Sequence, residues 1–176
     1  MPLDQIVVLD ETYATTKFTR LRGRSPRGKR LKARVPHGHW KLLTILAAIT
    51  VKGVLTAASI DCAADADVFR VFIDEFLVPT LRPGQVVVMD NLSVHKVSGV
   101  AESLARVGCR VVYLPPYSPD LSPIENVFSK LKQSLRTTAA RDVPTLHEAI
   151  GDAFATITPA DCRNCFDACG YSIQRS

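Results

Sequence analysis

Short apolar runs alternate along the chain with stretches whose apolar residues recur at helical spacing. The apolar runs cover 5–10, 40–50, 53–60, 85–90 and 109–114. Runs of this length, bounded by turn residues, are typical of buried strands. Only two residues separate 40–50 from 53–60, so we expect these two runs to form a β-hairpin. The pattern therefore predicts five strands.

Helical spacing appears between and after these runs. Apolar residues of 65–78 fall on one face behind an acidic first turn: Val68, Phe69, Phe72, Ile73, Phe76 and Leu77. Further helices are expected at 96–107, 123–138, 144–157 and 159–169, the first of them ending at Gly108. Strand–helix–strand steps require parallel pairing, whereas the hairpin requires antiparallel pairing. The sequence predicts an α/β fold with a mixed five-stranded sheet, flanking helices and extra helices at the C-terminus.

Length and composition favour a single globular domain over residues 1–176, of which 47% are hydrophobic. No apolar run reaches the roughly 18 residues that a membrane span needs. The N-terminal stretch has no basic region of the kind that opens a secretory signal. Five scattered cysteines suggest reduced thiols, and we expect a cytoplasmic, nucleoid-associated protein.

Positive charge is concentrated in one part of the chain. Residues 12–60 contain 11 of the 22 Lys and Arg and none of the 17 Asp and Glu. Clustered cations gain affinity for phosphate backbones by releasing counterions, although a solvated charged loop is the alternative. We expect nucleic-acid contacts from the cations of its densest part: Lys17, Arg20, Arg22, Arg24, Arg27, Lys29, Arg30, Lys32 and Arg34.

Acidic residues follow the predicted strands. Asp10 ends the run 5–10, Asp90 ends the run 85–90, and the last strand leads through a proline-rich link to Glu125. Because chemistry collects at the carboxyl ends of parallel strands, the three carboxylates would converge. Converging carboxylates need a cation, and oxygen ligands favour Mg²⁺ or Mn²⁺. Two such ions about 3.5–4 Å apart are a common means of cutting a phosphodiester.

The link itself, LPPYSPDLSPIE at 114–125, holds four prolines. Fixed φ angles would keep Glu125 near the position that a metal site demands. A rival interpretation is a capping box, in which Glu125 bonds back to the amide of Ser122. The same helix carries Lys132 and Arg136 on the flank of Glu125, and we expect both to contact phosphate.

Further polar residues lie beside the predicted rim. Asn91 and His95 follow Asp90 and could orient it or contact DNA, although His95 could also be an ordinary surface histidine. Asp120 could be a fourth acid, but it also suits a simple turn. Glu11 adjoins Asp10, and successive strand residues face opposite sides, so only one of them can face the metals.

Three motifs carry a resemblance to a known family. LDET at 9–12, VVMDNLSVHK at 87–96 and LPPYSPDLSPIENVFSKLK at 114–132 occur in this order, with 34 residues between Asp90 and Glu125. The sequence resembles the catalytic domain of DDE-type transposases, in the bacterial insertion-sequence branch of the mariner-like superfamily, over about residues 5–171.

This resemblance implies a ribonuclease H-like fold and two Mg²⁺ ions bound by Asp10, Asp90 and Glu125; on this ground we choose Asp10 over Glu11. It implies that water cleaves transposon ends, that the freed 3′-hydroxyl attacks target DNA, and that two copies form the synaptic complex. Such proteins carry an N-terminal helix-turn-helix region, and only nine residues precede Asp10. End recognition is therefore expected from a separate or frameshift-joined region. The alternatives are a ribonuclease H-like nuclease of other specificity and a non-catalytic DNA-binding remnant.

Overall fold

A mixed sheet forms the centre of the computed structural model, which describes residues 2–32 and 35–171. Its strands are β1 (Ile6–Thr15), β2 (Leu42–Thr50), β3 (Gly53–Ile60), β4 (Val86–Met89) and β5 (Arg110–Tyr113). They lie in the order β3-β2-β1-β4-β5. The β1–β2 and β2–β3 pairs are antiparallel, whereas β1–β4 and β4–β5 are parallel. The predicted mixed five-stranded sheet and its hairpin are thus confirmed.

Strand β1 is longer than expected. The prediction that it ends at Asp10 is wrong, because the strand continues to Thr15. Its parallel pairing with β4 covers only Ile6 to Val8, but its antiparallel pairing with β2 runs on from Val8 to Thr15. Pairing with β2 therefore keeps the backbone of β1 extended past Asp10. Asp10 therefore lies just beyond the point at which β1 loses its parallel neighbour.

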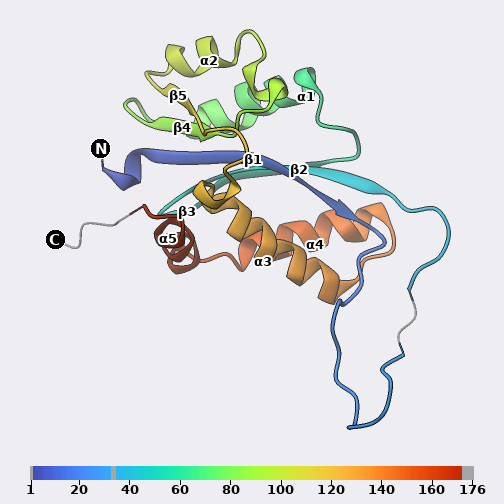
Figure 1. Cartoon of the computed structure of the whole chain (residues 1–176). Helices are drawn as coiled ribbons and strands as arrows, with labels where there is room; N and C mark the ends of the chain where they lie inside the picture. The colour runs from blue at the N-terminus through green and yellow to red at the C-terminus, as the bar shows by residue number, and fades with distance from the viewer. Residues whose placement is uncertain (1, 33–34, 172–176) are drawn as a thin grey trace.

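Helices cover both faces of the sheet (Figure 1). On one face lie α1 (Ala66–Val71), a π-helical segment (Phe72–Leu77) and α2 (Val100–Arg106). On the other lie α3 (Pro123–Thr138), α4 (Val143–Ala155) and α5 (Pro159–Ala168). None of the described helices is both long and apolar enough to cross a membrane.

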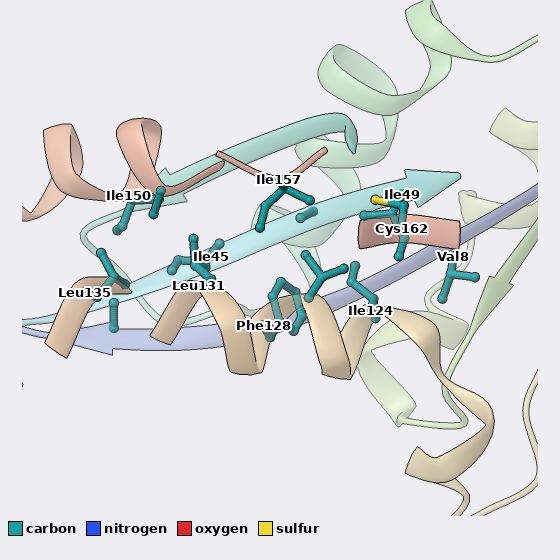
Figure 2. Close-up of a cluster of buried hydrophobic side chains, with 14 of the residues drawn as sticks. Val8, Ile45, Ile49, Ile124, Phe128, Leu131, Leu135, Ile150, Ile157 and Cys162 are labelled. Atoms are coloured by element: carbon teal, nitrogen blue, oxygen red, sulfur yellow. The ribbon is translucent and has the colours of Figure 1, made fainter. Parts of the chain in front are cut away.

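Alternation along β1 separates two apolar cores. Ile6 and Val8 face the core shared with α3, α4 and α5, whereas Val7 and Leu9 face the core shared with α1 and α2. Figure 2 shows the first core, in which Phe128 of α3 points toward the strands that carry Val8 and Ile45. Burial on both faces fixes the register of β1, because a slip by one residue would exchange the two faces.

The helix expected at 65–78 is real but irregular. Asp65 caps it, since its carboxylate accepts a hydrogen bond from the Val68 amide at 2.9 Å. After Val71 the turns widen into the π-helical segment and then tighten into a 3₁₀ turn at Val78–Thr80. The wider turn rotates Phe76 off the apolar stripe, so that its side chain is 45% exposed, contrary to the prediction.

Two other boundaries differ from the prediction. Instead of a helix over 96–107, a 3₁₀ turn at Ser93–Lys96 precedes α2, and Gly99 interrupts the helical path with a φ of 95°. Strand β5 was expected to be buried, but it lies at the edge of the sheet, and Val112 is 41% exposed. Helix α2 ends at Arg106, just before Gly108 with its φ of 73°, and the ends of the C-terminal helices lie within two residues of the predicted positions.

Candidate active site

The rim of the parallel strands gathers the predicted acids. Asp10 faces the same side of the sheet as Ile6 and Val8, because it follows them at even spacing along β1. Asp90 comes directly after Met89, the last residue of the neighbouring parallel strand β4. Parallel pairing therefore brings both carboxylates to one edge, as the sequence predicts.

Glu125 completes the group from helix α3. It is the third residue of that helix and lines one pocket, of about 340 Å³, together with Asp10 and Asp90. The remaining lining comes from the loop after β4 and from the proline-rich link: Asn91, Leu92, Leu114, Pro115, Pro116, Tyr117, Ser118, Pro119 and Ser122. Asp120 lies in a 3₁₀ turn at Pro119–Leu121, outside this lining.

The structure does not contain the capping box that would join Glu125 to Ser122. The amide of Ser122 donates to the carbonyl of Pro119 at 3.0 Å, so it is already satisfied. The hydroxyl of Ser122 makes no capping hydrogen bond, and only the backbone amide of Glu125 returns to the Ser122 carbonyl, at 3.1 Å. The Glu125 side chain is thus left exposed at the pocket.

Asp10 is in an unfavourable place for a carboxylate. It is 6% exposed, and its Oδ1 accepts a hydrogen bond from the Glu11 amide at 2.8 Å. Burial raises the pKa of Asp10 from 3.8 to about 7; the Glu11 hydrogen bond opposes this, and the charges of Glu11, Asp90 and Glu125 add to it. A bound cation would remove this penalty, which is the electrostatic condition of a metal site.

His95 links this edge to the opposite face of the sheet. Because Glu11 follows Asp10 in β1, its side chain points to the α1 side, where its Oε2 lies 2.6 Å from Nε2 of His95. Nδ1 of the same ring lies 2.5 Å from Oδ1 of Asp90, without the angle of a hydrogen bond. Oδ1 of Asp90 also accepts from the Leu92 amide at 3.1 Å. Two contacts therefore hold one oxygen of Asp90.

The position of His95 is itself well fixed. Its side chain is fully buried, its ring lies 4.6 Å from that of Phe69, and its carbonyl accepts from the Tyr113 hydroxyl at 3.1 Å. Burial by itself lowers the pKa of His95, but the Glu11 hydrogen bond and the surrounding acids raise it above the ordinary value overall. A protonated imidazole would hydrogen-bond Glu11 through Nε2 and place its charge beside Asp90.

These residues fit a divalent cation. Asp10, Asp90 and His95 offer ligand atoms that all lie within 4.8 Å of one another, and Glu125 adds a carboxylate to the same pocket. Nδ1 of His95 is buried without a hydrogen bond, while Glu11 holds the other nitrogen. His95 does not line the pocket, and a protonated imidazole has no lone pair for a metal, so its place is behind Asp90 and not in the ligand set. The sequence placed His95 near the rim, but its pairing with Glu11 was missed.

The basic segment begins beside α3. Arg141 Nη1 donates to the carbonyls of Thr16 and Phe18, at 2.9 and 2.8 Å, and so anchors the start of the loop between β1 and β2. The loop then extends away from the sheet (Figure 1). Its cations from Lys17 to Lys32 are all exposed, and Lys17 lies over the Trp40 ring at 4.1 Å. Arg34 lies outside the described residues.

A groove of about 500 Å³ joins this loop to helix α3. Arg20 and Arg22 line it from the loop, and Arg136 lines it from the helix, with its guanidinium 5.0 Å from the centre of the Phe18 ring. Lys132, half-buried on α3, is not part of its lining. Three of the predicted cations thus share one surface, which suits a phosphate backbone.

Comparison with known proteins places the chain in a family. A family model described as DDE superfamily endonuclease matches residues 5–147. No curated protein is significantly similar in sequence.

Among solved structures, the chain is similar to a Mos1 transposase paired-end complex with the left transposon end, at 16% identity and a TM-score of 0.77, over 94% of this chain and 52% of that one. It is also similar to the catalytic domain of Mos1 mariner transposase, at 16% identity and a TM-score of 0.66, over 98% and 85%.

The chain therefore spans about half the length of the Mos1 transposase in those complexes. Identities this low establish the fold, and the expected ribonuclease H-like arrangement is confirmed. The family model covers most of the chain and includes Asp10, Asp90 and Glu125. The chain thus belongs to the DDE superfamily endonuclease family.

Proposed function

We propose that this chain is the catalytic domain of a transposase, which cleaves DNA strands and joins them to target DNA in the movement of an insertion sequence. The observation that carries the proposal is the meeting of Asp10, Asp90 and Glu125 at one pocket, in a family of endonucleases. The similar Mos1 structures include complexes with a transposon end, with Mn and with Mg.

The donor set suits two Mg²⁺ or Mn²⁺ ions, held by Asp10, Asp90 and Glu125. When bound, such ions supply Lewis-acid activation of the attacking and leaving oxygens of a phosphodiester. Burial among acids raises the pKa of Asp10 to about 7 in the metal-free site, and Asp10 would have to be ionised to hold a cation. Glu11 and His95 hold Asp90 from the far side of the sheet.

The remaining parts of the proposal concern partners. The groove that joins the basic segment to α3 would hold the DNA backbone, with Arg20, Arg22 and Arg136 as phosphate contacts. Transposon ends and target DNA would both be bound, in a homodimer that joins two ends. A helix-turn-helix region, separate or joined by frameshifting, would recognise the ends, and residues 1–176 would be one catalytic domain in the cytoplasm.

The test joins this chain to a matching end-recognition domain and supplies the ends of the element with Mg²⁺ or Mn²⁺. We expect strand cleavage followed by joining to a target duplex. Asp90→Asn should abolish both reactions while DNA affinity in a gel-shift assay is retained, because the change removes a metal ligand and no cationic contact. The exposed Asp152→Asn on α4 is the matched control. Normal cleavage by Asp90→Asn would rule out the metal assignment.

A further inference from the structure

The loop between β1 and β2 leaves the sheet through a narrow neck. The amide of the buried Thr16 donates to the Lys41 carbonyl at 3.1 Å, and its hydroxyl accepts from the Lys41 amide at 3.0 Å. Lys17 and Trp40 lie beside this pair, with the ammonium 4.1 Å from the centre of the ring. Beyond the neck, the described cations of residues 20–32 are all exposed. The direction in which they point therefore depends on the contacts at the neck.

One arginine from a distant part of the sequence joins this neck. The connection between α3 and α4 lies beside the base of the loop (Figure 1). From that connection, Nη1 of Arg141 donates to the Thr16 carbonyl at 2.9 Å and to the Phe18 carbonyl at 2.8 Å. Hydrogen bonds from a charged donor are stronger than those between neutral groups. Arg141 thus holds the first residues of the loop from outside it.

The backbone of Arg141 is fixed on both sides. Helix α3 is closed by Ala139, whose φ is 53° and whose amide donates to the Leu135 carbonyl at 2.9 Å. Helix α4 begins after Asp142, whose carboxylate accepts from the Thr145 amide at 2.8 Å. Arg141 therefore lies in a short connection between two capped helix ends, and its side chain extends from a rigid support.

Helix α3 also supplies one wall of the cationic groove. Arg136 lines the groove from α3, and its guanidinium lies 5.0 Å from the centre of the Phe18 ring. Arg20 and Arg22 line the groove from the loop, shortly after Phe18 in the sequence. Their positions opposite Arg136 therefore depend on how the start of the loop is tied to α3. Because Glu125 lies in the first turn of the same helix, the groove also keeps a fixed relation to the carboxylates.

We propose that Arg141 is a positioning residue for DNA, which ties the loop to the end of α3 and so sets Arg20 and Arg22 opposite Arg136 before DNA binds. This inference rests on the proposed function, in which the groove holds the DNA backbone. Without Arg141, the loop would become ordered only on binding, and the entropy lost in ordering it would reduce the affinity. Arg141 is exposed but does not line the groove, so it acts on DNA through the loop.

The order of the neck is measured on the full chain without DNA, because Trp40 is the single tryptophan of the sequence. Arg141→Ala should increase the quenching of Trp40 fluorescence by acrylamide, whereas Arg141→Lys keeps a charged donor and should resemble the natural chain. The control is Arg163→Ala, at an exposed position of α5 outside the groove. Unchanged quenching in Arg141→Ala would overturn the inference. A large fall in its melting temperature would make Arg141 a structural residue and would also overturn it.

A double-mutant cycle on affinity for a short duplex separates positioning from direct contact. Arg141→Ala should weaken binding by about tenfold in the natural chain, through the cost of ordering the loop. Most of this effect should disappear when Arg20 and Arg22 are already replaced by glutamine.

The remaining outcomes of this cycle contradict different statements. In the glutamine background, a further loss of affinity with a salt slope lower by about 0.9 would mean that Arg141 contacts a phosphate itself, which overturns the inference. DNA binding that Arg141→Ala leaves unchanged contradicts the inference alone. A natural chain whose DNA binding does not depend on salt contradicts the proposed function of the groove, whatever the fluorescence of Trp40 shows.

Discussion

Replacing Asp10 by asparagine should stabilise the metal-free protein. The side chain is 6% exposed, and burial together with three nearby acids raises its pKa to about 7. Asparagine has nearly the same shape and keeps an oxygen that can accept the hydrogen bond of the Glu11 amide, now 2.8 Å long. The change therefore removes a buried negative charge while it preserves the local packing.

The sign and size of the stabilisation by Asp10→Asn follow from the pKa of Asp10. Below pH 3.8 the carboxyl is protonated in both the folded and the unfolded chain, so it has no effect on stability. As the pH rises toward 7, the unfolded chain releases the proton and the folded chain retains it, so the free energy of unfolding falls. The free energy of unfolding falls by about 1.5 kcal/mol at pH 5 and by about 4 kcal/mol above pH 7. Each pH unit between the unfolded and the folded pKa contributes about 1.4 kcal/mol.

Thermal unfolding in a chelating buffer measures the effect. Above pH 7 we expect Asp10→Asn to raise the melting temperature by on the order of 10 °C, because 1 kcal/mol shifts a chain of this length by about 2–4 °C. At pH 4 the two proteins should unfold together. Addition of Mn²⁺ should raise the melting temperature of the natural chain but not that of Asp10→Asn. Asp152→Asn, at an exposed position, should show neither effect.

The dependence on pH is the decisive result. A stabilisation that is equal at pH 4 and pH 8 would mean that packing, not charge, is responsible. A destabilisation at pH 8 would mean that the carboxylate of Asp10 is favourable in the metal-free fold, and the electrostatic argument for a cation at this pocket would then be wrong.

Two other changes test how the site is held. His95→Asn should weaken Mn²⁺ binding by about 10- to 100-fold, because it removes the link between Glu11 and Asp90. The control is His147→Asn, on α4, where the ring contacts Ser59 outside the pocket and Mn²⁺ affinity should not change. A thermal-shift titration measures both affinities, and equal values for His95→Asn and the natural chain would remove His95 from any positioning role. Glycine in place of both Pro115 and Pro116 should reduce metal-dependent cleavage more than stability, because the link would then hold Glu125 less firmly. Parallel losses of rate and melting temperature would make these prolines structural only.

The sequence allowed the sheet and its acidic rim to be predicted for a physical reason. Apolar runs mark strands wherever both faces are buried, and β1 and β4 are buried on both faces. Asp10 and Asp90 interrupt that apolar pattern at the same level of two neighbouring strands. A charge inside or just after a buried run needs a compensating partner, so the pattern itself indicated a site.

Other features depend on contacts between distant parts of the chain. Glu11 and His95 are 84 residues apart in sequence, and nothing local relates them. Alternation along β1 did predict that Glu11 and Asp10 point to opposite faces of the sheet. This was the one available signal that Glu11 needs a partner on the α1 side. The groove of Arg20, Arg22 and Arg136 likewise depends on where the loop folds. Hydrophobic periodicity carries no information about such pairings.

The two sides of the sheet meet at Asp90, and this explains how one small region tolerates four carboxylates. Asp10 and Glu125 face the pocket from the α3 side, where a cation can reach them. Glu11 lies on the other side, and His95 stands between it and Asp90 at 2.6 and 2.5 Å. Against the effect of burial, the surrounding acids raise the pKa of His95, and its protonated form would offset part of the repulsion without occupying the pocket. Among the residues that the structure describes, no ion pair neutralises Asp10 or Glu125. A divalent cation bound between them would supply that missing positive charge.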